Sequence, residues 1–246
     1  MAIIHTFICG FRYQYLTGDL QAYHNIYVSM PQYGWLSDEV LQGGRNAGFY
    51  MFMKLIAMLT GSNYQAFLFI VATIIEFAIA LLIYKYSPRP WLSYLIWNCV
   101  GFYIFGFSAV KQALSMAFIV FAMICILERM QMRFVLSVLI AGFIHAPAFA
   151  FLPAYWLAKR RINRSMIGLY IIAAGVIFAF RDEIVVFVSE YYYEESTMEI
   201  LQFGTEGLGG RFFLIVLILI CGVLLKGFRE KEFESLFHII VISAIF

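Results

Sequence analysis

The chain has 246 residues, of which 63% are hydrophobic and 13% are charged, and it carries a formal net charge of +2. Soluble domains have about 45–50% apolar and about 25% charged residues, so this composition excludes a soluble globular protein and predicts a polytopic membrane protein. So small a net charge gives no reason to expect a nucleic-acid partner. The four cysteines are scattered along the chain, which argues against a disulfide framework or a metal cluster.

Residues 1–46 are polar and aromatic, and we expect them to form an outer segment. They contain Arg12, Asp19 and Tyr23. Arg12 and Asp19 either pair with each other or belong to a site. The apolar segment that follows, up to residue 59, gives roughly 18 Å of helix against a bilayer core of about 30 Å, so we expect an interfacial or re-entrant helix.

Longer apolar runs predict membrane spans. They cover residues 64–83, 91–107, 109–127, 165–180 and 211–225, and a last run begins at residue 235. Together with a broken segment around His145, these runs predict an all-α fold of about 6–8 membrane helices. We expect a single integral-membrane domain over residues 1–246.

Basic residues in the loops predict the topology, because cytoplasmic loops carry an excess of Lys and Arg. The basic positions expected in the cytoplasm are Lys85 and Arg89, Arg129 and Arg133, the cluster at 159–164, and Lys226, Arg229 and Lys231. Residues 182–206 hold seven carboxylates and no Lys or Arg. We therefore expect residues 182–210 to form an outer acidic loop.

One apolar run, residues 134–157, lies between two basic clusters that are both expected in the cytoplasm. The run must therefore enter and return, as two half-helices of about a dozen residues each. Pro147 lacks a backbone donor and disfavours helix at Ala146, so we expect the break at His145-Ala146-Pro147. This places His145 at the tip of a hairpin in the outer half of the membrane, facing the same compartment as Lys111.

Several polar residues in apolar surroundings have two interpretations. Lys111, beside Gln112, either extends to the interface or is a cation that faces a cavity. His145 is either a core histidine bonded to a carbonyl or a functional group at a helix break. Glu76 is expected to be buried and hydrogen-bonded within its span. The Gly-rich residues 204–210, which precede Arg211, suit either phosphate binding or a flexible loop.

Several catalytic motifs are missing from the sequence. It has no Asp-x-Asp pair, P-loop, HExxH or nucleophile elbow. These absences argue against a metal-dependent sugar-nucleotide transferase and a nucleotide-driven pump. We expect neither a metal nor a cofactor.

Five segments resemble, in the same order, motifs of the EpsG-type, Wzy-like family of bacterial exopolysaccharide and capsule polymerases. They are Gly10-Phe11-Arg12-Tyr13 with Thr17-Gly18-Asp19 and Tyr23, Gly48-Phe49, Ser87-Pro88 with Ser93, Lys111-Gln112-Ala113-Leu114-Ser115, and Phe143-Ile144-His145-Ala146-Pro147-Ala148. The resemblance covers residues 10 to about 160. Lys111 stands where the family has Arg, and Lys cannot make a bidentate fork to phosphate oxygens. The family has a Ser after its His, and this chain has the sequence that contains Pro147 in its place.

The resemblance implies an enzyme without metal, in the bacterial inner (cytoplasmic) membrane, that polymerises lipid-linked oligosaccharide repeat units at the outer leaflet. A polyprenyl-pyrophosphate-linked glycan would be transferred to a sugar hydroxyl of another unit. The implied catalytic residues are His145, Lys111 and Asp19, and Arg12, Gln112, Arg211 and Tyr23 would bind substrate or pyrophosphate. Membrane lipid and other polysaccharide-assembly proteins are the expected partners.

Two other functions use similar features. One is a transporter or flippase for a lipid-linked sugar, and the other is a membrane acyltransferase acting on polysaccharide. The last apolar run gives only about 18 Å of helix, and no span precedes the outer segment. Compared with the family, we therefore expect the chain to be truncated at both ends, which would put its activity in doubt.

Overall fold

The computed structural model describes residues 1–41, 46–99, 101–160 and the single positions 168, 172, 175, 176, 179, 180 and 183. The chain divides into two compact units, Met1–Leu152 and Pro153–Phe246. The predicted spans beyond residue 160 fall almost entirely outside the described residues, as do Arg211 and all of the predicted acidic loop except Glu183. A single membrane domain over residues 1–246 stays a prediction.

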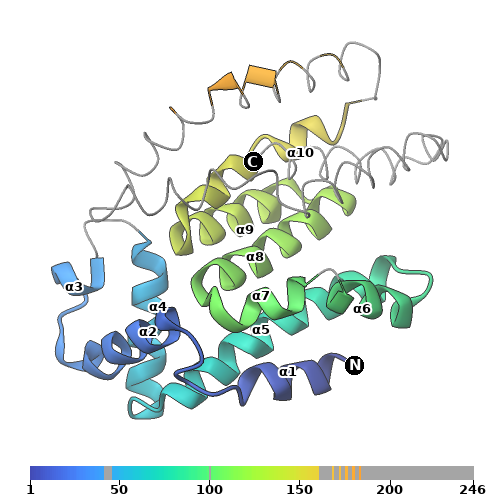
Figure 1. Cartoon of the computed structure of the whole chain (residues 1–246). Coiled ribbons are helices and arrows are strands. Elements are labelled where there is room, and N and C mark those ends of the chain that lie inside the picture. The colour runs from blue at the N-terminus through green and yellow to red at the C-terminus, as the bar shows by residue number, and fades with distance from the viewer. Residues whose placement is uncertain are drawn as a thin grey trace. The chain divides into compact units, whose positions relative to one another are not determined.

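The described part of the chain is helical, with no strand among residues 1–41, 46–99 and 101–160 (Figure 1). Its elements are α1 (Ala2–Gly10), α2 (Gly18–Ser29), η1 (Met30–Gln32), α3 (Asp38–Leu41), α4 (Ala47–Thr60), α5 (Tyr64–Tyr86), α6 (Pro90–Cys99), α7 (Phe102–Ser108), α8 (Val110–Leu127), α9 (Gln131–Ile144), η3 (Ala146–Phe151) and α10 (Ala154–Leu157). The all-α class is therefore confirmed for the described residues, whereas the count of membrane helices stays a prediction.

Two helices in the described part are long and apolar enough to cross a membrane. They are α5, with 23 residues, and α8, with 18 residues, close to the runs predicted at 64–83 and 109–127. Helix α4 has 14 residues, as expected for a segment too short to span the bilayer. Shorter apolar helices cover Gln131–Ile144 and Ala146–Leu157.

The predicted span 91–107 is wrong as a continuous helix. Helix α6 ends at Cys99, and α7 begins at Phe102 after Gly101, whose φ is 80°. Glycine adopts this left-handed conformation without steric cost, which permits the helix to stop inside an apolar run. Composition alone could not reveal this break, because the residues on both sides of it are apolar.

The C-terminal ends of α5 and α8 meet. Lys85 at the end of α5 forms an ion pair with Glu128, which follows α8. The two helices are also in contact, so they run parallel. The pair is partly exposed and contributes little stability. It does place Lys85 beside the turn that holds Arg129, so two basic loops predicted to be cytoplasmic lie at one end of the helices.

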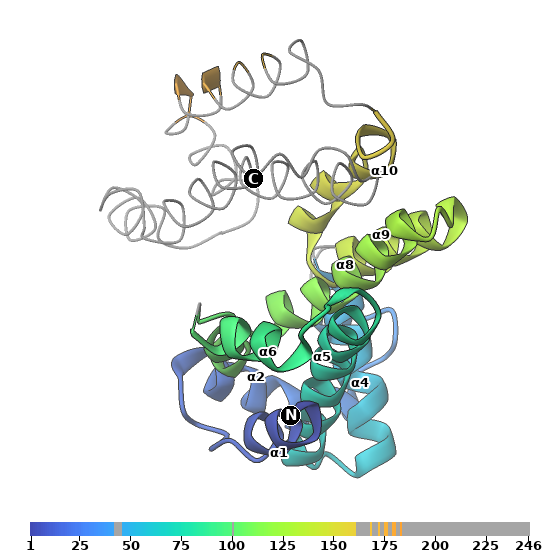
Figure 2. The same ribbon diagram turned by 90° about the vertical axis from the view of Figure 1, so that its right-hand side faces the viewer.

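The chain reverses at His145. Helix α8 packs side by side with α9 (Figures 1 and 2), and α9 ends at Ile144. His145 is extended, with φ −148° and ψ 105°, and η3 follows with Pro147 in its first turn. The predicted break is therefore at the correct position. Pro147 cannot donate the hydrogen bond that would continue the helix.

The segment after the break packs back along α9. A Cβ atom on Gly142 would lie within 2.6 Å of Cζ of the Phe149 ring, so η3 approaches α9 as closely as a glycine allows. The rings of Phe151 and Phe134 are 6.2 Å apart, and Phe134 lies in the first turn of α9. This reversal supports the predicted hairpin.

A second close approach joins α4 to α9 at Gly48. A Cβ atom at this position would lie 2.8 Å from the backbone carbon and oxygen of Phe143. The adjacent Phe49 is fully buried in the main hydrophobic core, with Leu20, Tyr27 and Leu114. Gly48 therefore sets the distance between α4 and the end of α9.

We predict that Gly48→Ala destabilises the protein by about 1–3 kcal/mol, the usual cost of overpacking a tight contact. The thermal midpoint of the purified protein in detergent measures this effect. Gly106→Ala is the matched control, because Gly106 is also helical and a Cβ there meets nothing within 4 Å. Equal midpoints for the two variants would contradict the close approach of α4 and α9.

We also predict that residues 133 and 159 face the same side of the membrane. Single cysteines at Arg133 and Lys159, in a background without the native cysteines, should react with a membrane-impermeant thiol reagent only after the cytoplasmic side is opened. A cysteine at Ser196, in the predicted outer loop, should react in intact cells and serves as the control. Reaction of only one of residues 133 and 159 in intact cells would show that the run crosses the membrane.

Candidate functional site

Lys111 and His145 lie at the same level on neighbouring helices. The Ser115 hydroxyl on α8 donates to the backbone oxygen of Ala141 on α9 at 2.9 Å. The same oxygen accepts the backbone N–H of His145 at 2.8 Å. Lys111 is one turn before Ser115, and His145 is one turn after Ala141, so the antiparallel pair brings both side chains to the same end.

Asp19 joins these two residues in one electrostatic cluster. The charge of Lys111 acts on the His145 imidazole, and the charge of Asp19 acts on the Lys111 ammonium. Lys111 and His145 are half-buried. Nδ1 of His145 is buried and has no hydrogen-bond partner among the described residues. Lys111 is thus within electrostatic range of both Asp19 and His145, and the three residues predicted to be catalytic come from α2, α8 and the end of α9.

The first turn of α2 positions Asp19. The Thr17 side chain accepts a hydrogen bond from the Leu20 N–H at 3.3 Å and caps the helix. Tyr23 lies one turn beyond Asp19, and its ring packs edge-to-face on Phe49 with centroids 5.1 Å apart. Tyr23 thereby holds α2 against α4.

Asn46 is a site residue that the sequence analysis missed. Its backbone is left-handed, with φ 52°, and its Oδ1 accepts the N–H of Ala146 at 3.4 Å. This bond joins the start of α4 to the residue that follows His145. The signal was the position of Asn46 just before the Gly48-Phe49 motif, since Asn is one of the few residues that tolerate this conformation.

Arg12 is buried, with 5% exposure, and does not pair with Asp19, although both residues are described. Its Nη1 donates to the backbone oxygen of Cys9 at 2.7 Å and to its sulfur at 2.9 Å. The guanidinium lies 6.0 Å from the centre of the Phe107 ring. Nε and Nη2 have no hydrogen-bond partner among the described residues. Arg12 thus retains two donors near the connection that leads to Lys111.

The structure gives less information on the remaining predicted site residues, Gln112 and Arg211. Gln112 is half-buried beside Lys111, and no hydrogen bond of its side chain is present within the described residues. Arg211 lies outside the described residues. No group of three or more His, Cys, Asp or Glu side chains suited to a metal occurs in the part of the chain that the structure describes.

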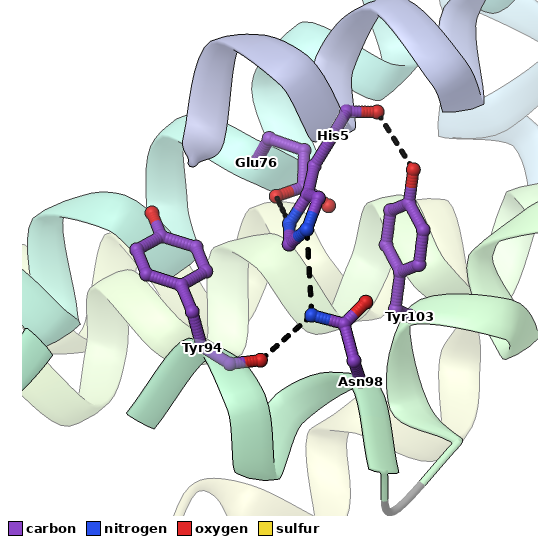
Figure 3. Close-up of polar contacts among 5 residues, drawn as sticks. All are labelled: His5, Glu76, Tyr94, Asn98 and Tyr103. Atoms are coloured by element: carbon purple, nitrogen blue, oxygen red, sulfur yellow. Dashed lines mark hydrogen bonds and ion pairs between the residues drawn. The ribbon is translucent and has the colours of Figure 1, made fainter. Parts of the chain in front are cut away.

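A second polar cluster lies apart from Lys111 and joins four helices (Figure 3). Nδ1 of His5, on α1, is 3.6 Å from Oε2 of Glu76, on α5. Asn98 of α6 lies with its amide nitrogen 3.3 Å from Nε2 of His5 and 2.7 Å from the Tyr94 backbone oxygen. The Tyr103 hydroxyl donates to the His5 backbone oxygen at 2.9 Å. These contacts attach α1 to the helices around it.

The hydrogen-bond pattern favours one tautomer of His5. The Asn98 amide donates to Nε2, so the ring proton belongs on Nδ1, where it faces Glu76. Glu76 was expected to be hydrogen-bonded, yet its Oε2 has no hydrogen-bond partner among the described residues and lies 3.6 Å from Nδ1 of His5, a contact that is an ion pair only when the ring is protonated. The sequence could not pair these residues, since only the tertiary packing of α1 on α5 brings them together.

A model of the EpsG family matches residues 1–246, the whole chain. The chain belongs to the EpsG family. The family recognised from the sequence motifs is therefore confirmed, and it gives this member a polysaccharide-polymerase-related role in exopolysaccharide biosynthesis and a place in a membrane. No curated protein and no solved structure matches the chain.

The shared carbonyl of Ala141 yields a prediction for this EpsG family member. Ser115→Ala removes the α8–α9 hydrogen bond and should lower the free energy of unfolding by about 1 kcal/mol. It should also shorten the exopolysaccharide made by cells. Without this bond α9 can shift along α8, and Lys111 and His145 then no longer lie at the same height along the helix pair. Ser29→Ala is the control, since the Ser29 hydroxyl donates at 2.9 Å to Ile26 within α2 alone. Equal shortening by both variants would show that the α8–α9 bond has no special part.

Proposed function

We propose that this protein joins lipid-linked oligosaccharide repeat units at the outer leaflet of the bacterial inner membrane. The observation that supports this function best is the cluster of Asp19, Lys111 and His145. The cluster lies at the end of the α8–α9 pair opposite to Glu128 and the basic turn. If that turn is cytoplasmic, the cluster faces the compartment in which repeat units are polymerised.

The proposed reaction is a glycosyl transfer. The bond between the anomeric carbon and the pyrophosphate oxygen breaks, and the carrier pyrophosphate leaves with the electron pair. A new bond forms between the anomeric carbon and the hydroxyl oxygen of a second lipid-linked unit. The proton of that hydroxyl passes to a base. The leaving group gains negative charge, so a fixed cation beside it stabilises the transition state.

Lys111 supplies that cation in the proposal. Its ammonium has no hydrogen-bond or ion-pair partner among the described residues, which leaves its donors available to phosphate oxygens. Arg12 retains two unpaired donors and would bind a second group of oxygens, together with Gln112 and Arg211. Tyr23 would contact the sugar from α2.

His145 and Asp19 are the candidate bases. The ring of His145 is half-buried, and a neutral imidazole can accept a proton at its unprotonated nitrogen. A protonated ring beside Lys111 would be unfavourable by itself. The bound pyrophosphate would offset both positive charges. Asp19 would accept the proton if the acceptor sugar approached from the side of α2.

We predict that Lys111→Ala lowers the rate of polymerisation by about 10²–10³, the usual effect of removing one charge-stabilising group. Single repeat units should remain on the lipid. Lys111→Arg should preserve or raise the rate, because Arg makes a bidentate contact with phosphate. His145→Ala should also lower the rate, without loss of folded protein if the residue is catalytic.

The assay uses purified protein in liposomes with lipid-linked repeat units and scores glycan length. Longer glycans indicate a polymerase, whereas glycans that only change leaflet indicate a flippase. Lys85→Ala is the control, because Lys85 is at the opposite end of the helices and pairs with Glu128. Normal glycan length from a folded variant lacking both Lys111 and His145 would refute this site.

A further inference from the structure

An apolar groove lies beside the catalytic cluster, between α4, α5, α8 and α9, and has a volume of about 180 Å³. Its lining residues share an apolar character, and they include Phe52, Ile74, Leu114, Phe118, Ile140 and Phe143. Leu114 forms the floor and is 1% exposed, whereas Ile140 and Phe143 are 37% and 50% exposed. The groove is therefore closed below and open along the edge formed by α9.

The groove leads away from Lys111. Lys111, Leu114 and Phe118 are at positions i, i+3 and i+7 of α8, so they form one stripe on the same face of the helix. On the other wall, Ile144 lines the groove and is followed directly by His145. The cation and the imidazole are thus at one end, and aromatic and aliphatic side chains continue from it.

The lining determines what can fill this space. Water needs two to four polar partners in a cavity, and these side chains offer none. An apolar chain fits the lining, but an uncharged apolar molecule would make no use of the Lys111 ammonium at the end of the groove. A molecule with an anionic head followed by an apolar chain matches the order of groups on the protein.

We propose that this groove holds the first isoprene units of the polyprenyl carrier, with the pyrophosphate beside Lys111. This inference rests on the proposed function, since it names the site for the carrier of the same substrate. The contact between Gly48 and Phe143 fixes the width between α4 and α9. The open edge at Ile140 admits the chain sideways from the bilayer.

Photocrosslinking tests the groove without any need for turnover. The full-length protein in nanodiscs is mixed with a polyprenyl pyrophosphate that carries a diazirine on its second isoprene unit, and labelled peptides are identified by mass spectrometry. A phospholipid with a diazirine in its acyl chain is the comparison probe. The polyprenyl probe should label Phe52 or Phe118, and the phospholipid should label them at least tenfold less.

Ile140→Trp should fill the groove and reduce polyprenyl labelling at least tenfold. Leu139→Trp is the matched control, because Leu139 is adjacent, has 46% exposure and does not line the groove. It should leave the labelling unchanged. Labelling outside the groove, equal labelling by the phospholipid, or an unaffected Ile140→Trp variant would overturn the assignment.

The outcomes separate this inference from the proposed function. If the wild-type protein lengthens glycans in liposomes but the polyprenyl probe labels elsewhere, the groove assignment fails and the polymerase stands. If the probe labels the groove but no glycan is ever lengthened, the polymerase function fails and the groove remains a polyprenyl site.

Discussion

The backbone oxygen of Ala141 accepts two hydrogen bonds, one from the Ser115 hydroxyl and one from the His145 N–H. The first comes from α8, and the second is the last bond of α9. A shift of α9 by one turn would break the Ser115 bond. Such a shift is unfavourable, because buried polar groups without partners cost free energy in apolar surroundings. The relative level of Lys111 and His145 depends on this bond, and so does the position of the groove at the end of α9.

The other buried polar side chains also join helices. Lys54, with 2% exposure, donates to the backbone oxygens of Met30 and Tyr33 and so holds η1 on α4. His5 and Glu76 connect α1 to α5 in a similar way. Lys54 has two hydrogen bonds within the fold, whereas Arg12 keeps two unpaired donors among the described residues.

The features that could be predicted from the sequence are those set by local chemistry. Long apolar runs indicated α5 and α8, and Pro147 indicated the break after α9. Features that depend on tertiary packing could not be predicted from the sequence. Gly101 ends a helix within an apolar run, and Asn46 reaches Ala146 only because α4 packs against α9. Lys111 and His145 were expected to face the same compartment because the basic loops and the break at Pro147 put both residues in the outer half of the membrane, whereas no sequence pattern relates His5 to Glu76.

The parallel arrangement of α5 and α8 has a topological consequence. Two parallel neighbours cannot be joined by a tight turn, so the chain must travel back along their whole length between them, as in a crossover connection. Helices α6 and α7 make this return path, with 10 and 7 residues and a corner at Gly101. At about 1.5 Å per residue, neither helix could do so alone. The return is therefore made in two steps, and the second step delivers the chain to the end of α8 that carries Lys111.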